Sequence, residues 1–243
     1  MPGQQAGQQA GKQGTVIWLR PEHAAIGRPA ERSRAEITAA AIEIADREGL
    51  DALSMRRVAA ALGTGAASLY RYVATRDDLL DLMTDATAAE YDLTDLTAPT
   101  GHWRQDLLAI AHQARRIMHR HPWLPDLTIT RPVLGPHGAD LLEHVLTVLA
   151  DHPAPPARKL EAFALLNALT AMFVQNELAA TDATAHRQTA YLTHIAAAGT
   201  HPRITALLAG STHTHSHTHG EHDGEYHDQF DTVLQRTLAA ALD

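Results

Sequence analysis

The sequence predicts an all-α protein with an N-terminal three-helix head and a larger C-terminal helical body. Apolar residues recur at helical spacing from residue 33 onward, and no segment alternates apolar and polar residues strongly enough for a strand. Hydrophobic residues make up 45% of the 243 residues, which suffices for a core. Pro and Gly residues separate the helical stretches, as expected for connecting turns.

The charge is unevenly distributed along the chain. Residues 1–76 carry 10 Lys and Arg against 7 Asp and Glu, whereas residues 77–243 carry 10 against 21, within a net charge of -8. A basic front on an acidic body is typical of a nucleic-acid-binding head on a non-binding body. The absence of cysteine excludes disulfides, thiolate zinc sites and cysteine nucleophiles.

No segment predicts a membrane span or a secretory signal. The longest nearly apolar run, residues 162–174, is shorter than the roughly 20 residues that a transmembrane helix needs. The first residues also lack an apolar stretch behind a charged start. We therefore expect a cytoplasmic protein that does not enter the membrane.

Residues 1–32 are predicted to be a disordered tail followed by a basic arm. The first 14 residues are rich in Gln, Gly and Ala and carry almost no charge, which is typical of disorder. Arginines follow, and Pro21 and Pro29 prevent a continuous helix.

Residues 33–80 form the predicted head. Its first helix begins with Ser33 and Glu36, a capping box, and ends at Gly49. The apolar stripe of this helix is Ile37, Ala41, Ile44 and Ala45.

A short helix after Ser54, a sharp turn at Gly63 and a third helix over Ala66–Val73 make a helix-turn-helix, and Thr75 begins a fourth helix. We expect small residues at the crossing of the second and third helices. They are Ala59, Ala60, Ala61, Ala66 and Ala67.

Residues 81–243 form the predicted helical body. The helices expected there span 102–120, 137–150, 155–180, 184–198, 202–209 and 227–242. The middle of 155–180 is apolar nearly all round, and 227–242 places Phe230, Val233, Leu234, Leu238 and Leu242 on one face. These two helices are predicted to form a dimer bundle, the alternative being that both pack inside one subunit.

The stretch from Ser33 to Leu82 resembles the DNA-binding head of the tetracycline-repressor (TetR) family. The matching pieces are IxxAAxxIAxxEGLDALSMRRVAAALG, SLYRYV and TRDDLLDLM, and the body adds HPWLPDL and DQFDTVLQR. The resemblance implies a transcriptional regulator without enzymatic activity or a required cofactor. It would bind a palindromic double-stranded DNA operator as a homodimer, act as a repressor, and be released by a small-molecule effector.

The resemblance also implies individual roles. Arg56 would read a base, Ser54 would contact phosphate, and the start of the third helix would face base edges. Because the alanines there offer no hydrogen bonds, DNA shape would contribute, with arm arginines in the minor groove. The predicted DNA-binding set is Arg28, Arg34, Ser54, Arg56, Thr64, Ala66, Ala67, Ser68, Tyr70, Arg71, Tyr72 and Arg76.

Candidate effector-binding residues are the aromatic and polar side chains within the apolar faces of the body. They are Trp103, His112, Met118, Trp123, Phe163, Asn167, Met172, Phe173, Asn176 and Glu177. Most such residues are simply core, but Asn167 is an amide inside an apolar run and must find a hydrogen-bond partner.

A histidine-rich loop is predicted over residues 211–227. Four of its histidines alternate, namely His213, His215, His217 and His219. Imidazoles at this density can chelate Zn²⁺, Ni²⁺ or Cu²⁺, although a solvated connector explains the composition as well.

Two other classes of protein stay open. One is a helical metal-binding protein or metal-dependent enzyme that uses this loop, or His112, His119 and Glu177; the other is an inert helical scaffold. Asp77, Asp81 and Asp85 share one helical face, which we interpret as a solvated acidic face rather than a cation site.

Overall fold

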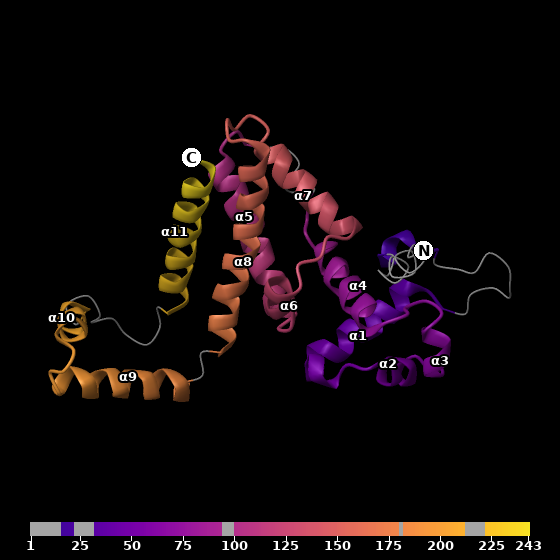
Figure 1. Cartoon of the computed structure of the whole chain (residues 1–243), viewed down its shortest axis with the longest axis horizontal. Coiled ribbons are helices and arrows are strands. Elements are labelled where there is room, and N and C mark those ends of the chain that lie inside the picture. The colour runs from indigo at the N-terminus through magenta and orange to yellow at the C-terminus, as the bar shows by residue number, and fades with distance from the viewer. Residues whose placement is uncertain (1–15, 22–31, 94–99, 180–181, 212–221) are drawn as a thin grey trace, which may run out of the picture.

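The structure is a computed structural model that describes residues 16–21, 32–93, 100–179, 182–211 and 222–243. All regular elements in these ranges are helices, eleven α-helices and two short 3-10 helices, which confirms the predicted all-α fold (Figure 1). The head contains α1 (Arg34–Glu48), the 3-10 helix η3 (Leu50–Ala52), α2 (Met55–Ala61), α3 (Ala66–Leu69) and the first part of α4 (Arg76–Ala88).

Local signals set the head helices where the sequence predicts them. The Ser33 hydroxyl accepts a hydrogen bond from the Glu36 amide at 3.1 Å, and the Glu36 carboxylate accepts one from the Ser33 amide at 2.8 Å. Gly49 ends α1 with a φ of 80°, and Gly63 turns the chain after α2 with a φ of 66°. These left-handed conformations favour glycine, because a Cβ atom would be strained there.

Two predictions about the head are wrong. The third helix ends at Leu69 rather than Val73, and turns follow it. Of the five small residues expected at the helix crossing, only Ala59 is buried and Ala66 is partly buried. The larger side chains of Val58 and Leu69, both fully buried, fill the crossing instead.

The body is built around α8 (Pro156–Ala179), which contacts α5 (Trp103–Arg120), α6 (Leu124–Thr130) and α11 (His222–Leu242). The helix α7 (Pro136–Val148) packs on α4 and α5.

Sequence periodicity missed α6, because it is short and lies between prolines. A proline at the start of a helix costs no hydrogen bond, so Pro125 is compatible with it. The last helix begins at His222, five residues before the predicted start.

The predicted dimer stripe of α11 is buried within one chain. Phe230, Leu234, Leu238 and Leu242 pack in one cluster with residues of α5, α7 and α8. The two helices expected to meet a partner therefore meet each other, and a dimer would have to use other faces of them.

The helices α9 (Asp182–Ala197) and α10 (Pro202–Ser211) contact each other and project away from the body (Figure 1). Large apolar side chains are exposed on both, with Tyr191 at 65% and Leu207 at 70%. Among the described residues, no helix combines the length and apolar content that crossing a bilayer requires.

A joint around the buried His121 connects the head to the body. His121, at the end of α5, places Nδ1 2.8 Å from an oxygen of Asp46 in α1 and Nε2 2.8 Å from an oxygen of Glu90, just beyond α4. Trp123 donates to the same Asp46 oxygen at 2.7 Å. This places Trp123, a predicted effector contact, in the joint.

We expect His121→Ala to lower the free energy of unfolding by about 2–3 kcal/mol, because it removes a buried group that bonds two carboxylates. Urea unfolding followed by circular dichroism measures the loss. His102→Ala, at an exposed histidine, is the control and should cost less than about 0.5 kcal/mol. Equal losses for both variants would mean that the joint does not stabilise the fold.

Candidate DNA-binding surface and ligand cavity

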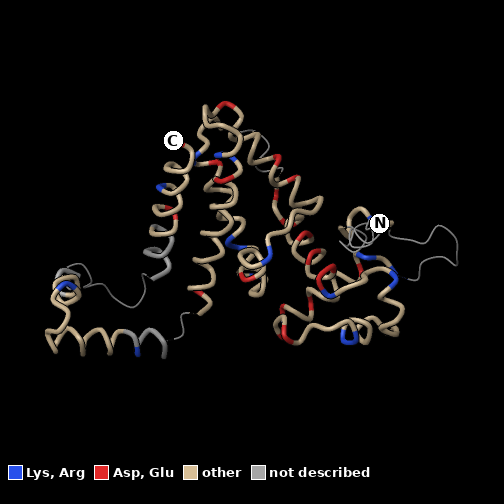
Figure 2. The backbone as a smooth tube through the Cα atoms, viewed as in Figure 1, with Lys and Arg blue, Asp and Glu red and all other residues tan. Residues whose placement is uncertain are grey.

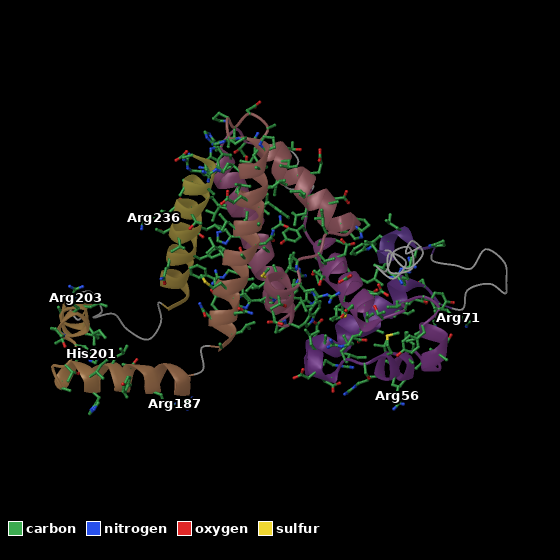
Figure 3. All side chains as sticks on the ribbon, viewed as in Figure 1. Arg56, Arg71, Arg187, His201, Arg203 and Arg236 are labelled. Atoms are coloured by element: carbon green, nitrogen blue, oxygen red, sulfur yellow. The ribbon has the colours of Figure 1, made fainter. Side chains whose placement is uncertain are left out.

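The outer face of α2 and α3 carries exposed cationic and aromatic side chains. Arg56 and Arg71 point away from the head into solvent (Figure 3), and Tyr70 is 51% exposed. Arg56 makes no ion pair or hydrogen bond within the described part of the chain, whereas its neighbour Arg57 pairs with Glu48. Basic residues also mark this edge of the head in Figure 2. Such a face can meet phosphates and base edges.

Several predicted DNA-binding residues also hold the head together. The Ser54 hydroxyl caps α2, and Arg71 donates to the Ser68 hydroxyl at 3.2 Å. Arg76 donates to the carbonyl of Leu50 at 3.1 Å. The predicted contacts Thr64, Ala66 and Ser68 are partly exposed, Ala67 is exposed, and Arg28 lies outside the described residues.

Arg34 and Tyr72 are placed differently from the other predicted contacts. Tyr72 is buried in the head core. The Arg34 guanidinium donates to the Tyr72 carbonyl at 3.1 Å and to three carbonyls of residues 17–21. Sequence alone could not separate these inward roles from a DNA contact, because both use the same residue types.

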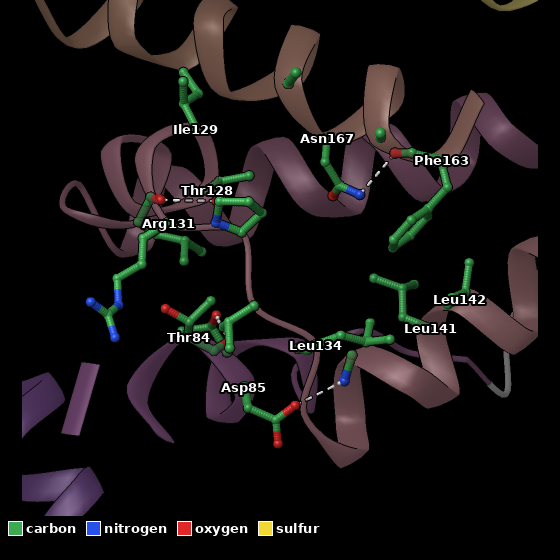
Figure 4. Close-up of a pocket in the computed structure, with 18 of the residues that line it drawn as sticks. Thr84, Asp85, Thr128, Ile129, Arg131, Leu134, Leu141, Leu142, Phe163 and Asn167 are labelled. Atoms are coloured by element: carbon green, nitrogen blue, oxygen red, sulfur yellow. Dashed lines mark hydrogen bonds between the residues drawn. The ribbon is translucent and has the colours of Figure 1, made fainter. Parts of the chain in front are cut away.

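A cavity of about 540 Å³ lies between α4, α6, α7 and α8 (Figure 4). Its lining is predominantly apolar, and this size suits a drug-sized molecule. The residues that line it are Thr84, Asp85, Thr87, Ala88, Tyr91, Met118, Leu124, Thr128, Ile129, Arg131, Pro132, Val133, Leu134, Gly138, Leu141, Leu142, Phe163, Ala164, Asn167 and Ala168.

A few polar groups interrupt the apolar wall. The Asn167 side-chain amide donates to the Phe163 carbonyl at 3.0 Å, so the partner that the sequence required is a backbone oxygen. Figure 4 shows Asn167 and Phe163 reaching toward the same space. Burial raises the pKa of the Tyr91 hydroxyl, which keeps it protonated and able to donate.

Charged groups stand at one side of the cavity. Asp85 is buried and accepts hydrogen bonds from the amides of Gly138 at 3.0 Å and His137 at 3.4 Å, which caps the start of α7. Arg131 pairs with Asp81 at 2.8 Å and with Asp77 at 3.1 Å. Although burial lowers the pKa of Arg131, these carboxylates raise it above its usual value. The three carboxylates of α4 that the sequence suggested are solvated therefore bind other protein groups, and among them only Asp77 is largely exposed.

Three of the ten predicted effector residues, Met118, Phe163 and Asn167, line this cavity. Others surround Phe230 on the opposite side of α8, where His112 and Phe173 make edge contacts with its ring. The remaining positions lie elsewhere. Trp103 stacks edge-on with His152, Trp123 is in the joint, Met172 and Asn176 are exposed, and Glu177 is paired with Arg115.

The lining residues from α4 and from the connection between α6 and α7 were not predicted from the sequence. Periodicity shows which face of a helix is buried, but not where neighbouring helices leave a gap. A weak signal existed in α4, where Thr84, Asp85 and Thr87 place polar groups beside buried apolar ones.

The described residues contain no cluster of three or more His, Asp or Glu side chains placed to hold a metal. Of the proposed catalytic histidines, His119 contacts Glu177 at 2.7 Å, but Arg115 also bonds both oxygens of that carboxylate. The alternating histidines His213, His215, His217 and His219 lie outside the described residues.

The chain therefore combines a helix-turn-helix head with a helical body that holds a ligand-sized cavity. This combination defines a class of helix-turn-helix proteins whose DNA-binding and ligand-binding domains lie in one polypeptide. Family comparisons agree with this class. The family described as "Bacterial regulatory proteins, tetR family" matches residues 37–83, and "Tetracyclin repressor-like, C-terminal domain" matches residues 97–239. The chain belongs to the TetR family.

Curated relatives are regulators of the same type. The chain is 48% identical over 117 residues to the HTH-type transcriptional repressor DrrR1 of Streptomyces coeruleorubidus, covering 46% of this chain and 42% of that protein. It is 40% identical over 135 residues to an HTH-type transcriptional regulator of Saccharopolyspora erythraea, covering 56% of each. The chain thus spans about half the length of the curated relatives it matches.

Solved structures extend the similarity to most of the chain. Apo ActR from Streptomyces coelicolor aligns with a TM-score of 0.72 at 28% identity, covering 88% of this chain and 98% of ActR. ActR in complex with actinorhodin aligns with a TM-score of 0.68 at 26% identity, covering 88% and 96%.

Proposed function

We propose that this protein is a cytoplasmic transcriptional repressor without enzymatic activity. It binds a palindromic operator as a homodimer and releases it when a small molecule enters the cavity. One observation carries the proposal. The helix α4 begins in the head, directly after α2, α3 and their turns, here called the recognition unit. Its second half, with Thr84, Asp85 and Thr87, forms one wall of the cavity.

The mechanism is a shift between two populations. A ligand in the cavity contacts α4, α6 and α7 together, so it favours the spacing of these helices that fits it. Because α4 is continuous, a change at Thr84 alters the orientation of the head at Thr75. Ligand and operator then weaken each other's binding by the same factor.

The cavity suggests the class of effector. Its wall is mostly apolar, with Tyr91, Thr128 and Asn167 among its few polar groups. ActR has been solved with actinorhodin and with (S)-DNPA. We therefore propose an apolar ring system with a few hydrogen-bonding groups, and actinorhodin is a suitable first probe.

Arg56 tests the DNA-binding face. Arg56→Ala should weaken binding to an operator selected from random DNA by about 1–3 kcal/mol, with little effect on random duplex, because it removes a base contact. Fluorescence anisotropy across a salt series measures both affinities. Arg236→Ala, at an exposed arginine on α11, should change neither. Equal losses on both DNAs would contradict base reading.

Ala164 tests the cavity. Because Ala164 is exposed on α8 and lines the cavity, Ala164→Trp should narrow the cavity without disturbing the core. We expect actinorhodin binding at least about tenfold weaker, with operator affinity unchanged. Ala139→Trp, an exposed position on α7 outside the lining, is the control. Titration calorimetry measures the ligand, and unaltered binding in Ala164→Trp would place the ligand elsewhere.

Apolar surface that the described part of the chain leaves uncovered supports the dimer. On α8, Leu160, Met172 and Leu178 are between 42% and 48% exposed, and α9 and α10, which follow it, project from the body. Burial of such apolar surface against a second copy favours association through the hydrophobic effect.

We expect the wild type to sediment as a dimer and the double variant Met172→Glu, Leu178→Glu to sediment as a monomer. Dimerisation of the double variant would bury the two new carboxylates at the interface, which is costly. Analytical ultracentrifugation gives the masses. The control Ala150→Glu, at an exposed residue after α7, should remain dimeric. A dimeric double variant would place the interface on another face.

A further inference from the structure

The segment of residues 16–21, here called the N-terminal brace, lies between the head and the cavity wall. It contains the short helix η2 (Ile17–Leu19), which contacts α4. Ile17 is fully buried although the segment lies outside the helix-turn-helix. The brace is therefore packed onto the protein.

The brace is bound to the recognition unit through Arg34. This guanidinium donates to the carbonyls of Ile17 at 3.1 Å, Arg20 at 2.9 Å and Pro21 at 3.1 Å. It also donates to the carbonyl of Tyr72, three residues after α3 ends, at 3.1 Å. One rigid, planar group thus fixes the backbone of the brace to the backbone that follows the recognition helix.

A second bond fixes the brace to the start of α4. Arg20 forms an ion pair with Asp78, a partly enclosed contact at the head end of the helix. The Asp78 carboxylate also accepts from the Thr75 amide at 3.1 Å and so completes the capping box of α4. Movement of the brace therefore changes hydrogen-bonded contacts at both ends of the turn between α3 and α4.

The other side of the brace contacts Gly135, which directly precedes α7 and lies between the lining residues Leu134 and Gly138. A Cβ atom at this residue would overlap the Trp18 ring and the Asp85 carboxyl group. Asp85 in turn accepts a hydrogen bond from the Gly138 amide, and both residues line the cavity. Trp18 therefore rests on the backbone that leads into α7, with no room for a side chain between them.

We propose that Trp18 is a positioning residue that couples the cavity to the DNA-binding head through the brace, in parallel with α4. A ligand that displaces the start of α7 moves Gly135 against Trp18, and Arg34 passes this shift to Tyr72. The inference rests on the proposed function, because it concerns how cavity and operator communicate.

Gly135→Ala imitates this displacement without a ligand. Its φ of -97° suits alanine, so the only new strain is the overlap with Trp18 and Asp85. We expect binding to a duplex selected by the wild type to weaken about fivefold or more, within the usual range of coupling between sites. Ala139→Ser, at an exposed residue of α7 outside the cavity lining, is the control and should bind the duplex as the wild type does.

The double variant Trp18→Ala, Gly135→Ala decides the route. If the brace carries the effect, removing the ring restores binding toward that of Trp18→Ala alone. If the double variant binds as weakly as Gly135→Ala, the strain travels through Asp85 and α4, and the proposal is overturned. Binding by Gly135→Ala equal to the wild type also overturns it. Thermal unfolding by circular dichroism verifies that each variant is folded.

Hydrogen exchange provides a readout that needs neither operator nor effector. Trp18→Ala should accelerate amide exchange over residues 66–73 relative to the wild type, because the Arg34 contact to Tyr72 loses its support. Unchanged exchange there would contradict the proposal. A wild type that selects no DNA would refute the repressor function instead, so the two failures can be told apart.

Discussion

The Asp46 carboxylate accepts hydrogen bonds from both His121 and Trp123, and the position of the head on the body depends on this contact. His121 is buried, and burying an imidazole is costly unless its polar atoms find hydrogen-bond partners. The imidazole meets this requirement and also reaches Glu90 through its other nitrogen. One side chain therefore fixes the first helix of the head, the end of α4 and the end of α5 at a single point.

Because of this joint, the head cannot swing freely on α4. Head residues such as Val58 and Leu69 share one continuous apolar cluster with Ile117 of α5 and Val174 of α8. Close-packed interiors shift between discrete arrangements rather than deforming gradually. Cavity and head are thus parts of one packed unit, in which a change of helix spacing at the cavity has to be matched at the head.

Features encoded locally could be predicted from the sequence, and features made by tertiary contact could not. Capping residues such as Ser33 and Thr75 act within four residues, so the helix starts they predict are found in the structure. The cavity depends on where α4, α6, α7 and α8 fail to touch, which no single-helix pattern encodes.

Asp77, Asp81 and Asp85 illustrate the limit. They share one helical face, yet Asp77 is largely exposed and Asp81 partly buried, both paired with Arg131, while Asp85 is buried as the cap of α7.

The recognition unit explains why rigidity matters for this protein. Its second helix, α3, is four residues long and begins with Ala66 and Ala67, which offer no hydrogen bonds to bases. Under the proposed function, specific recognition rests on a few long side chains, chiefly Arg56 and Arg71, which point out from the head. A long side chain reads a base only if its backbone is held in a fixed position. Arg34 bonds the Tyr72 carbonyl and so fixes the backbone beside Arg71, which is the positioning that the proposed function requires.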